Sequence, residues 1–164
     1  MLTNDRVWDL FNRSTQMMKG LFNYESAFRN YVGQAIQSFL DDNVMYAEVR
    51  PNFFDKYIVS DDGERQLDHT VWMQIIQEQI DVKIRELERL GMSDFFHGIK
   101  VIYCAPRSIQ KKDMIWCLRD CIALKQAFPD LICGSYQLFF FIDHFSTHSH
   151  SLSLSLSFEL HFRN

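Results

Sequence analysis

The sequence has no excess of positive charge, no long apolar run and no paired-cysteine motif, and each absence excludes a class of protein. Its formal net charge is −4, which argues against nucleic acid as a partner because nucleic-acid-binding surfaces are usually basic. No stretch reaches the about 20 apolar residues that cross a bilayer, so no membrane partner is expected. The polar segment 1–9 lacks the apolar core of a signal peptide.

The four cysteines also exclude two kinds of small scaffold. None of them forms a Cys-x-x-Cys pair, so the sequence predicts neither a zinc ribbon nor a disulfide framework. All four lie among apolar residues, which favours reduced, buried thiols. They are Cys104, Cys117, Cys121 and Cys133.

What remains is an ordinary globular composition with alternating helical and β patterns. The chain is 47% hydrophobic and 23% charged, the balance of a folded domain. Apolar spacing predicts helices at 8–19, 24–41, 67–90 and 109–128, and strands at 44–50, 98–104 and from 131 onward. Residues 52–66 are predicted to be a loop, with a turn at 61–63.

This order predicts an α/β fold of parallel βαβ units. Two architectures fit it, an open doubly wound sheet and part of a (β/α)8 barrel. No glycine-rich phosphate loop follows any predicted strand, which weakens the case for a nucleotide-binding open sheet.

The composition changes after residue 134, where we place a domain boundary. Residues 135–164 contain no lysine, four of the six histidines and an alternating Ser-Leu run. We interpret 1–134 as the folded domain and 135–164 as a disordered or irregular low-complexity tail, such as translated intron sequence would give. The pair His148 and His150 has metal-like spacing, but we read it as a chance pair within this tail.

Several motifs in residues 5–134 occur in an order that resembles the adenosine deaminase family, specifically its adenosine deaminase-related growth factor branch. The strongest is Asp-Asn-Val-x-Tyr-x-Glu-x-Arg at 42–50. The others are Trp-Asp-Leu-Phe at 8–11, Leu-Phe-Asn-Tyr-Glu at 21–25, Gly-Ile-Lys-Val-Ile-Tyr at 98–103, Arg-Ser at 107–108 and Phe-Pro-Asp-Leu-Ile-Cys-Gly at 128–134.

The resemblance implies a partial (β/α)8 barrel containing about strands 2–4. It also implies a zinc-dependent hydrolase in which a metal-activated water attacks C6 of adenosine, giving inosine and ammonia. The matched region contains none of the family's zinc ligands and not its proton donor. The chain as written is therefore expected to be inactive and to hold no zinc specifically. The branch's dimerisation region is also absent, and the localisation stays open, although the branch is often secreted.

The resemblance carries over a few candidate substrate contacts. In this branch the helix that begins with the tryptophan lies over the nucleoside pocket, which points to Trp8, Phe11, Asn12 and Thr15. Some members present a histidine to the substrate where Pro106 stands here. The alternative for the two aromatic residues is that they pack into the core.

Glu48 and Arg50 lie two residues apart on one face of the predicted strand at 44–50. Two charged side chains on one face of a strand could serve acid–base chemistry. We favour a structural role, in which a buried charge pair fixes the geometry of the strand.

Two further functional classes remain open at this point. The chain could be a non-catalytic nucleoside-binding module that retains the tryptophan helix, or a small α/β domain unrelated to deaminases. Saturable binding of adenosine by the isolated chain would favour the first of these.

Overall fold

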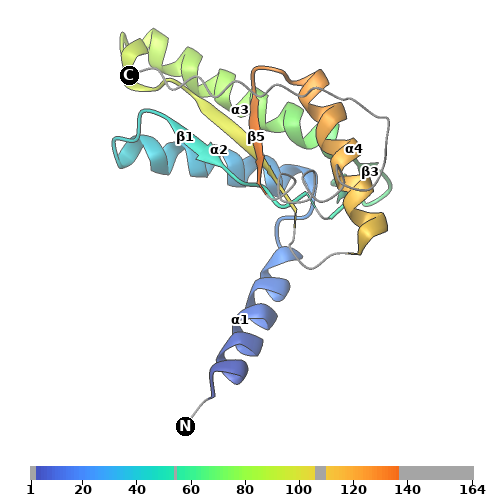
Figure 1. The fold of residues 1–164 in the computed structure, drawn as a ribbon. Coiled ribbons are helices and arrows are strands. Elements are labelled where there is room, and N and C mark those ends of the chain that lie inside the picture. Colours follow the sequence, from blue (N-terminus) through green and yellow to red (C-terminus); the bar gives the residue numbers. More distant parts are fainter. Residues whose placement is uncertain (1–2, 54, 106–109, 137–164) are drawn as a thin grey trace.

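A three-stranded parallel sheet forms the centre of the computed structural model, which describes residues 3–53, 55–105 and 110–136 (Figure 1). Strand β1 (Ala47–Val49) pairs with β4 (Ile99–Cys104), and β4 pairs with β5 (Ile132–Tyr136). The spatial order β1-β4-β5 follows the chain, so each new strand is added on the same side. The predicted α/β fold is confirmed, and the described strands form an open sheet without closing into a barrel.

Four helices flank or extend from this sheet, as the apolar spacing predicts. They are α1 (Asn4–Lys19), α2 (Glu25–Asp41), α3 (His69–Arg89) and α4 (Lys111–Ala127), with a short 3-10 helix η1 (Ser93–Phe95) before β4. Helix α3 connects β1 to β4 and α4 connects β4 to β5, which makes the two crossovers of the predicted βαβ units.

Helices α2 and α3 end in the same way. Asn43 has φ of 60° after α2, and Gly91 has φ of 71° after α3. In both cases the next amide, of Val44 or Met92, donates back to a carbonyl near the helix end, at 2.7 and 2.9 Å. This left-handed termination satisfies the last carbonyls and turns the chain toward the sheet.

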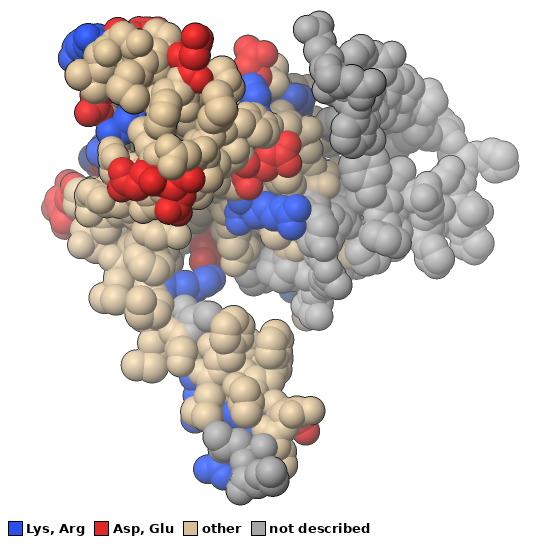
Figure 2. Space-filling view, turned by 90° about the vertical axis from the view of Figure 1, so that its left-hand side faces the viewer, with Lys and Arg blue, Asp and Glu red and all other residues tan. Residues whose placement is uncertain are grey.

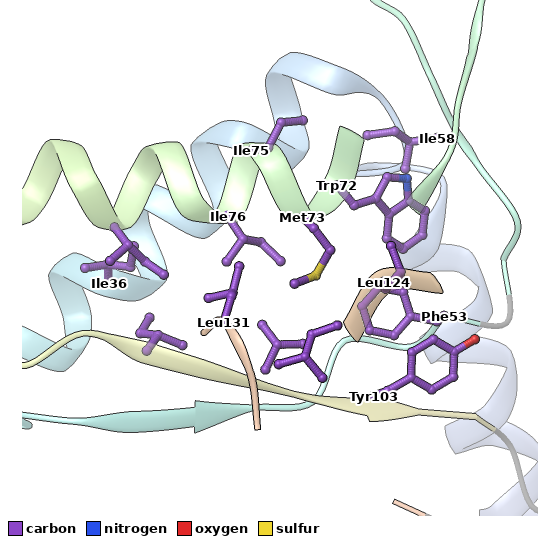
Figure 3. Packing of buried hydrophobic residues seen from close by; sticks show 14 of the residues in the cluster. Ile36, Phe53, Ile58, Trp72, Met73, Ile75, Ile76, Tyr103, Leu124 and Leu131 are labelled. Atoms are coloured by element: carbon purple, nitrogen blue, oxygen red, sulfur yellow. The ribbon is translucent and has the colours of Figure 1, made fainter. Parts of the chain in front are cut away.

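The core lies between one face of the sheet and helices α2, α3 and α4. Along β4, Ile99, Val101 and Tyr103 are buried, whereas the alternate residues are only half-buried. Figure 3 shows the buried side chains of α3, among them Trp72 and Ile76, above the strands. One face of the parallel sheet is thus packed, and the other is only partly covered by the described residues.

Three predictions need correction. The predicted loop 52–66 contains an antiparallel hairpin, β2 (Ile58–Val59) with β3 (Gln66–Leu67), around the predicted turn, where Gly63 has φ of 77°. The strand at 44–50 is shorter than predicted. Cys133 is exposed, because it lies on the face of β5 that the helices leave uncovered, although Cys117 is buried as predicted.

Helix α1 projects away from the rest of the structure (Figure 1). Most of its side chains are exposed, and in Figure 2 its visible face, the lower projection, is largely uncharged. No described helix is both long and apolar enough to cross a membrane.

Candidate functional site

The candidate substrate residues of α1 lie on an exposed apolar face. Trp8 is 62% exposed and Phe11 is 55% exposed, and their rings stack with centroids 5.5 Å apart. The alternative in which both pack into the core is therefore wrong. Asn12 is half-buried beside them, and Thr15 lies one turn further along the helix. Two stacked, exposed aromatic rings offer a flat apolar surface of the kind that binds another ring.

The C-terminal end of α1 is attached next to the carboxyl end of the sheet. Lys19 Nζ lies 2.5 Å from Asp55 Oδ2 in the segment that follows β1. In the same segment, the Phe53 amide donates to the carbonyl of Cys104, the last residue of β4, at 3.1 Å. Ligands of parallel α/β sheets bind at the carboxyl ends of the strands, so the aromatic face of α1 starts from the edge where a ligand is expected.

A shallow open depression lies where α1 meets α2. Its volume is about 610 Å³, and its lining includes Leu21, Phe22, Tyr24, Asn30, Tyr31 and Gln34. The ring of Tyr31 is 57% exposed and lies 5.4 Å from that of Phe22. Tyr31 falls at helical spacing with the apolar residues of α2, but its ring is not covered as that spacing alone would predict.

A buried polar cluster lies behind this edge. His69 is 2% exposed, and its Nδ1 lies 2.6 Å from Asp120 Oδ2 while its Nε2 lies 2.7 Å from the Asp55 carbonyl. The Tyr103 hydroxyl donates to the same Asp120 oxygen at 2.9 Å. Burial, and then the Asp120 carboxylate, raise the pKa of Tyr103 well above its usual range, so its hydroxyl stays a donor.

Aromatic rings enclose this cluster. Phe53 stacks on Tyr103 with centroids 4.6 Å apart and meets His69 edge-on at 5.0 Å. Trp72 and Trp116 lie 4.9 and 5.7 Å from the His69 ring. Such apolar surroundings strengthen the hydrogen bonds inside them and make an unpaired polar group there costly.

The thiols of α4 lie close to the same cluster. Burial raises the pKa of Cys121 to about 12, with the Asp120 charge as a further cause. Burial also raises the pKa of Cys117. Both cysteines are therefore thiols at neutral pH, which makes them weak nucleophiles.

Glu48 and Arg50 are not buried as predicted. Both are exposed, because the outward face of β1 is not covered by a described helix. The Tyr46 hydroxyl donates to Glu48 Oε1 at 3.0 Å, and burial together with this bond raises the pKa of Tyr46 to about 12. The assignment of Glu48 and Arg50 to structure over catalysis remains a prediction.

The remaining candidate positions divide between described and undescribed parts of the chain. Pro106, His148 and His150 lie outside the described residues. Among residues 3–53, 55–105 and 110–136, no group of three or more His, Cys, Asp or Glu side chains could hold a metal ion.

Comparison with known proteins agrees with the ordered motifs. The chain is 30% identical over 128 residues to the adenosine deaminase 2 of Pongo abelii and to that of Homo sapiens, covering 78% of this chain and 23% of each relative. It is 25% identical over 130 residues to the adenosine deaminase 2-A of Danio rerio. No protein-family model matches it.

Over 78% of its length the chain is homologous to proteins named adenosine deaminase 2. The resemblance to this family predicted from residues 42–50 and the flanking motifs is therefore confirmed. The chain spans about a quarter of the length of the curated relatives that it matches, 23 to 24%.

The buried cluster around His69 was not predicted from the sequence. His69 and Asp120 are 51 residues apart and belong to no motif that the spacing reveals. One signal was present, because Asp68 directly before His69 is a typical helix N-cap. In the structure Asp68 accepts from the amides of Thr70 and Val71, which fixes His69 at the first position of α3.

Proposed function

We propose that this chain forms one wall of the nucleoside pocket in an adenosine deaminase-like hydrolase, as about strands 2–4 of a (β/α)8 barrel. The observation that carries the proposal is the stacked, exposed pair Trp8 and Phe11 on a helix attached at the carboxyl end of a parallel sheet. Active sites of (β/α)8 enzymes are built at that end. The homology to proteins named adenosine deaminase 2 supplies the class of substrate.

The proposed reaction is hydrolytic deamination of an adenosine-type nucleoside. Water adds at C6 of the purine, the C6–N bond breaks, and the products are inosine and ammonia. The contribution of α1 is to stack on the purine and to keep bulk water away from it. Asn12 supplies a polar group beside this surface, and Thr15 and Pro106 complete the proposed contacts.

Zinc is the metal that the family implies, and it would activate the attacking water. The described residues do not offer the set of three or four donors that such a site needs. We therefore assign no zinc ligand among the described residues. We also propose that the 164-residue chain by itself does not turn over adenosine.

Ammonia release tests the last point directly. The purified chain is incubated with adenosine and added Zn²⁺, and ammonia and inosine are quantified. We expect no product above the protein-free control. Turnover that a chelator abolishes would contradict the proposed inactivity of this chain.

Calorimetric titration with adenosine tests the proposed pocket wall. If the chain binds adenosine, Trp8→Ala should weaken that binding by about 5- to 150-fold, because aromatic stacking on a base contributes about 1–3 kcal/mol. The matched control is Tyr46→Ala, which removes another exposed ring at the amino end of β1 and should leave binding unchanged. Equal losses in both variants would exclude α1 as the binding surface.

The same titration tests a second function. The exposure of Trp8 and Phe11 also favours a non-catalytic nucleoside-binding module, because the rings are accessible without any further part of a barrel. Saturable binding without ammonia release identifies this function for the isolated chain. Absence of binding restricts the function to a structural α/β part of the barrel.

A further inference from the structure

A continuous series of polar contacts runs from the sheet to α1. Tyr103 on β4 donates to Asp120 on α4, and Asp120 binds His69 at the start of α3. His69 in turn contacts the backbone carbonyl of Asp55, whose carboxylate binds Lys19 at the end of α1. Four elements and the segment after β1 are therefore joined through neighbouring hydrogen bonds.

Both ring nitrogens of His69 are engaged, and their partners restrict which atom can donate. A backbone carbonyl only accepts, so Nε2 must donate to Asp55. Nδ1 faces a carboxylate oxygen at 2.6 Å, where two acceptors would repel each other, so a proton lies between Nδ1 and Asp120. The Asp120 carboxyl group and the Asp55 carbonyl therefore engage both ring nitrogens of His69.

Asp55 is the residue where the buried and the exposed parts meet. Its carbonyl is held from the protein interior, whereas its carboxylate, in a side chain 34% exposed, reaches Lys19, in a side chain 42% exposed. The hydrogen bond with His69 holds the backbone of Asp55, and the Asp55 carboxylate holds Lys19 in the last turn of α1. Most other side chains of α1 are exposed, so this contact is well placed to decide the direction in which the helix projects.

We infer that His69 is a positioning residue, which holds α1 and its aromatic face in place through Asp55 and Lys19. Asp120 of α4 faces His69 directly. Tyr103 of β4 bonds to Asp120, Cys117 of α4 lies next to Tyr103, and Lys56 lies over the Trp116 ring at 5.1 Å. The consequence for nucleoside binding rests on the function proposed above. The connection itself does not, and it is testable without any ligand.

The rate of trypsin cleavage after Lys19 measures this connection. The protease cleaves after lysine and arginine, and Lys19 must leave Asp55 before it can enter the specificity pocket of the protease. The readout is the initial rate of cleavage after Lys19 divided by the rate after Arg85, an exposed residue of α3. Cleavage after Arg13, within α1, reports whether the helix itself has melted.

Two single variants and their combination carry the test. Asp55→Asn weakens the grip on Lys19 while keeping the carbonyl that His69 binds, and Asp120→Asn removes the carboxylate that holds His69. We expect each to raise the Lys19 ratio roughly two- to fivefold, the range for a partly exposed ion pair. Because both act through one connection, the double variant should not exceed the larger single effect.

Two results would contradict this connection. An unchanged Lys19 ratio in Asp120→Asn, or a double variant whose effect is the product of the two single effects, overturns the inference. Lys19→Arg is the conservative control, since arginine remains a trypsin site and keeps the ion pair, and Asp120→Asn should raise the cleavage ratio in that background by the same factor as in the unaltered protein.

A milder variant covers the case in which Asp120→Asn fails to fold. Tyr103→Phe keeps the ring stacked on Phe53 and removes only the hydroxyl that donates to Asp120. We expect a smaller rise in the Lys19 ratio, with the Arg13 rate unchanged. A Lys19 ratio equal to that of the unaltered protein also overturns the inference.

Discussion

Helices α1 and α3 are both amphipathic, but only one of them has a covered apolar face. Helix α3 buries Trp72, Met73 and Ile76 against the sheet, whereas α1 leaves Trp8 and Phe11 in solvent. The pattern of apolar residues therefore predicts where a helix forms but not what it packs against. An apolar face that the fold does not use for its own stability is available for binding.

The largest expected contrast comes from truncating one indole in each helix. Trp72 is 5% exposed, and its Nε1 donates to the Leu67 carbonyl at 3.1 Å. Trp72→Ala should lower the free energy of unfolding by about 3–5 kcal/mol, whereas Trp8→Ala should change it by less than about 0.5 kcal/mol. Urea denaturation followed by far-UV circular dichroism measures both. Similar losses would show that α1 is packed in solution.

Alkaline pH should lower the free energy of unfolding. The pKa of Cys121 is raised from 9.0 to about 12 in the folded state, so folding favours the protonated thiol. Its contribution is fully present below pH 9 and is lost as the pH rises through 12. The free energy of unfolding, measured by denaturant titration across this range, should fall with pH. Cys121→Ala should flatten the slope, and an unaltered slope would assign the effect to other groups.

Removing the N-cap side chain of α3 should cost more stability than removing that of α1. Asp68 accepts from the Thr70 amide at 3.0 Å, whereas Thr3 accepts from the Arg6 amide at 3.4 Å. Asp68→Ala should cost about 1 kcal/mol of stability. Thr3→Ala should cost less, because fraying of the exposed start of α1 releases no core packing. Thermal unfolding of the two variants compares them, and a larger loss for Thr3→Ala would contradict this ranking.

The smallest contrast concerns the glycines that follow the two helices. Gly91 has φ of 71°, whereas Gly20 has φ of −61°, and an added Cβ would meet no atom at either position. Gly91→Ala should therefore cost about 0.5–1 kcal/mol through backbone strain alone. Gly20→Ala should be neutral or slightly stabilising, as measured by the same thermal unfolding. A loss at Gly20 would show that its φ in solution is different.

The periodic parts of the chain could be predicted from the sequence. Helices α2, α3 and α4 and the central strand β4 follow from apolar spacing, because their buried faces repeat with the period of the element. The two-residue strands β2 and β3 could not be predicted in this way, since two residues carry no period. Their turn was predictable, because Asp61, Asp62 and Gly63 have turn chemistry of their own.

The candidate site was predictable only in part. Residue type and family resemblance pointed to Trp8 and Phe11, but whether the rings are covered depends on tertiary contacts that spacing does not encode. His69 could not be predicted as a structural centre, because its partners Asp120 and Asp55 come from distant positions in the chain. The exposure of Glu48 depends on which face of the sheet the described helices cover, which the local sequence of the strand does not reveal.

The order β1-β4-β5 also bears on how such a chain can be extended. Each crossover adds its strand on the same side of the previous one, so the hydrogen bonds already formed are not interrupted by the next unit. Strand β1 presents its outer edge without a partner among the described strands, and that edge can accept a preceding strand while Ile99, Val101 and Tyr103 keep their packing. The architecture is therefore modular, because the core packs against one face of the sheet and does not depend on the outer edge of β1.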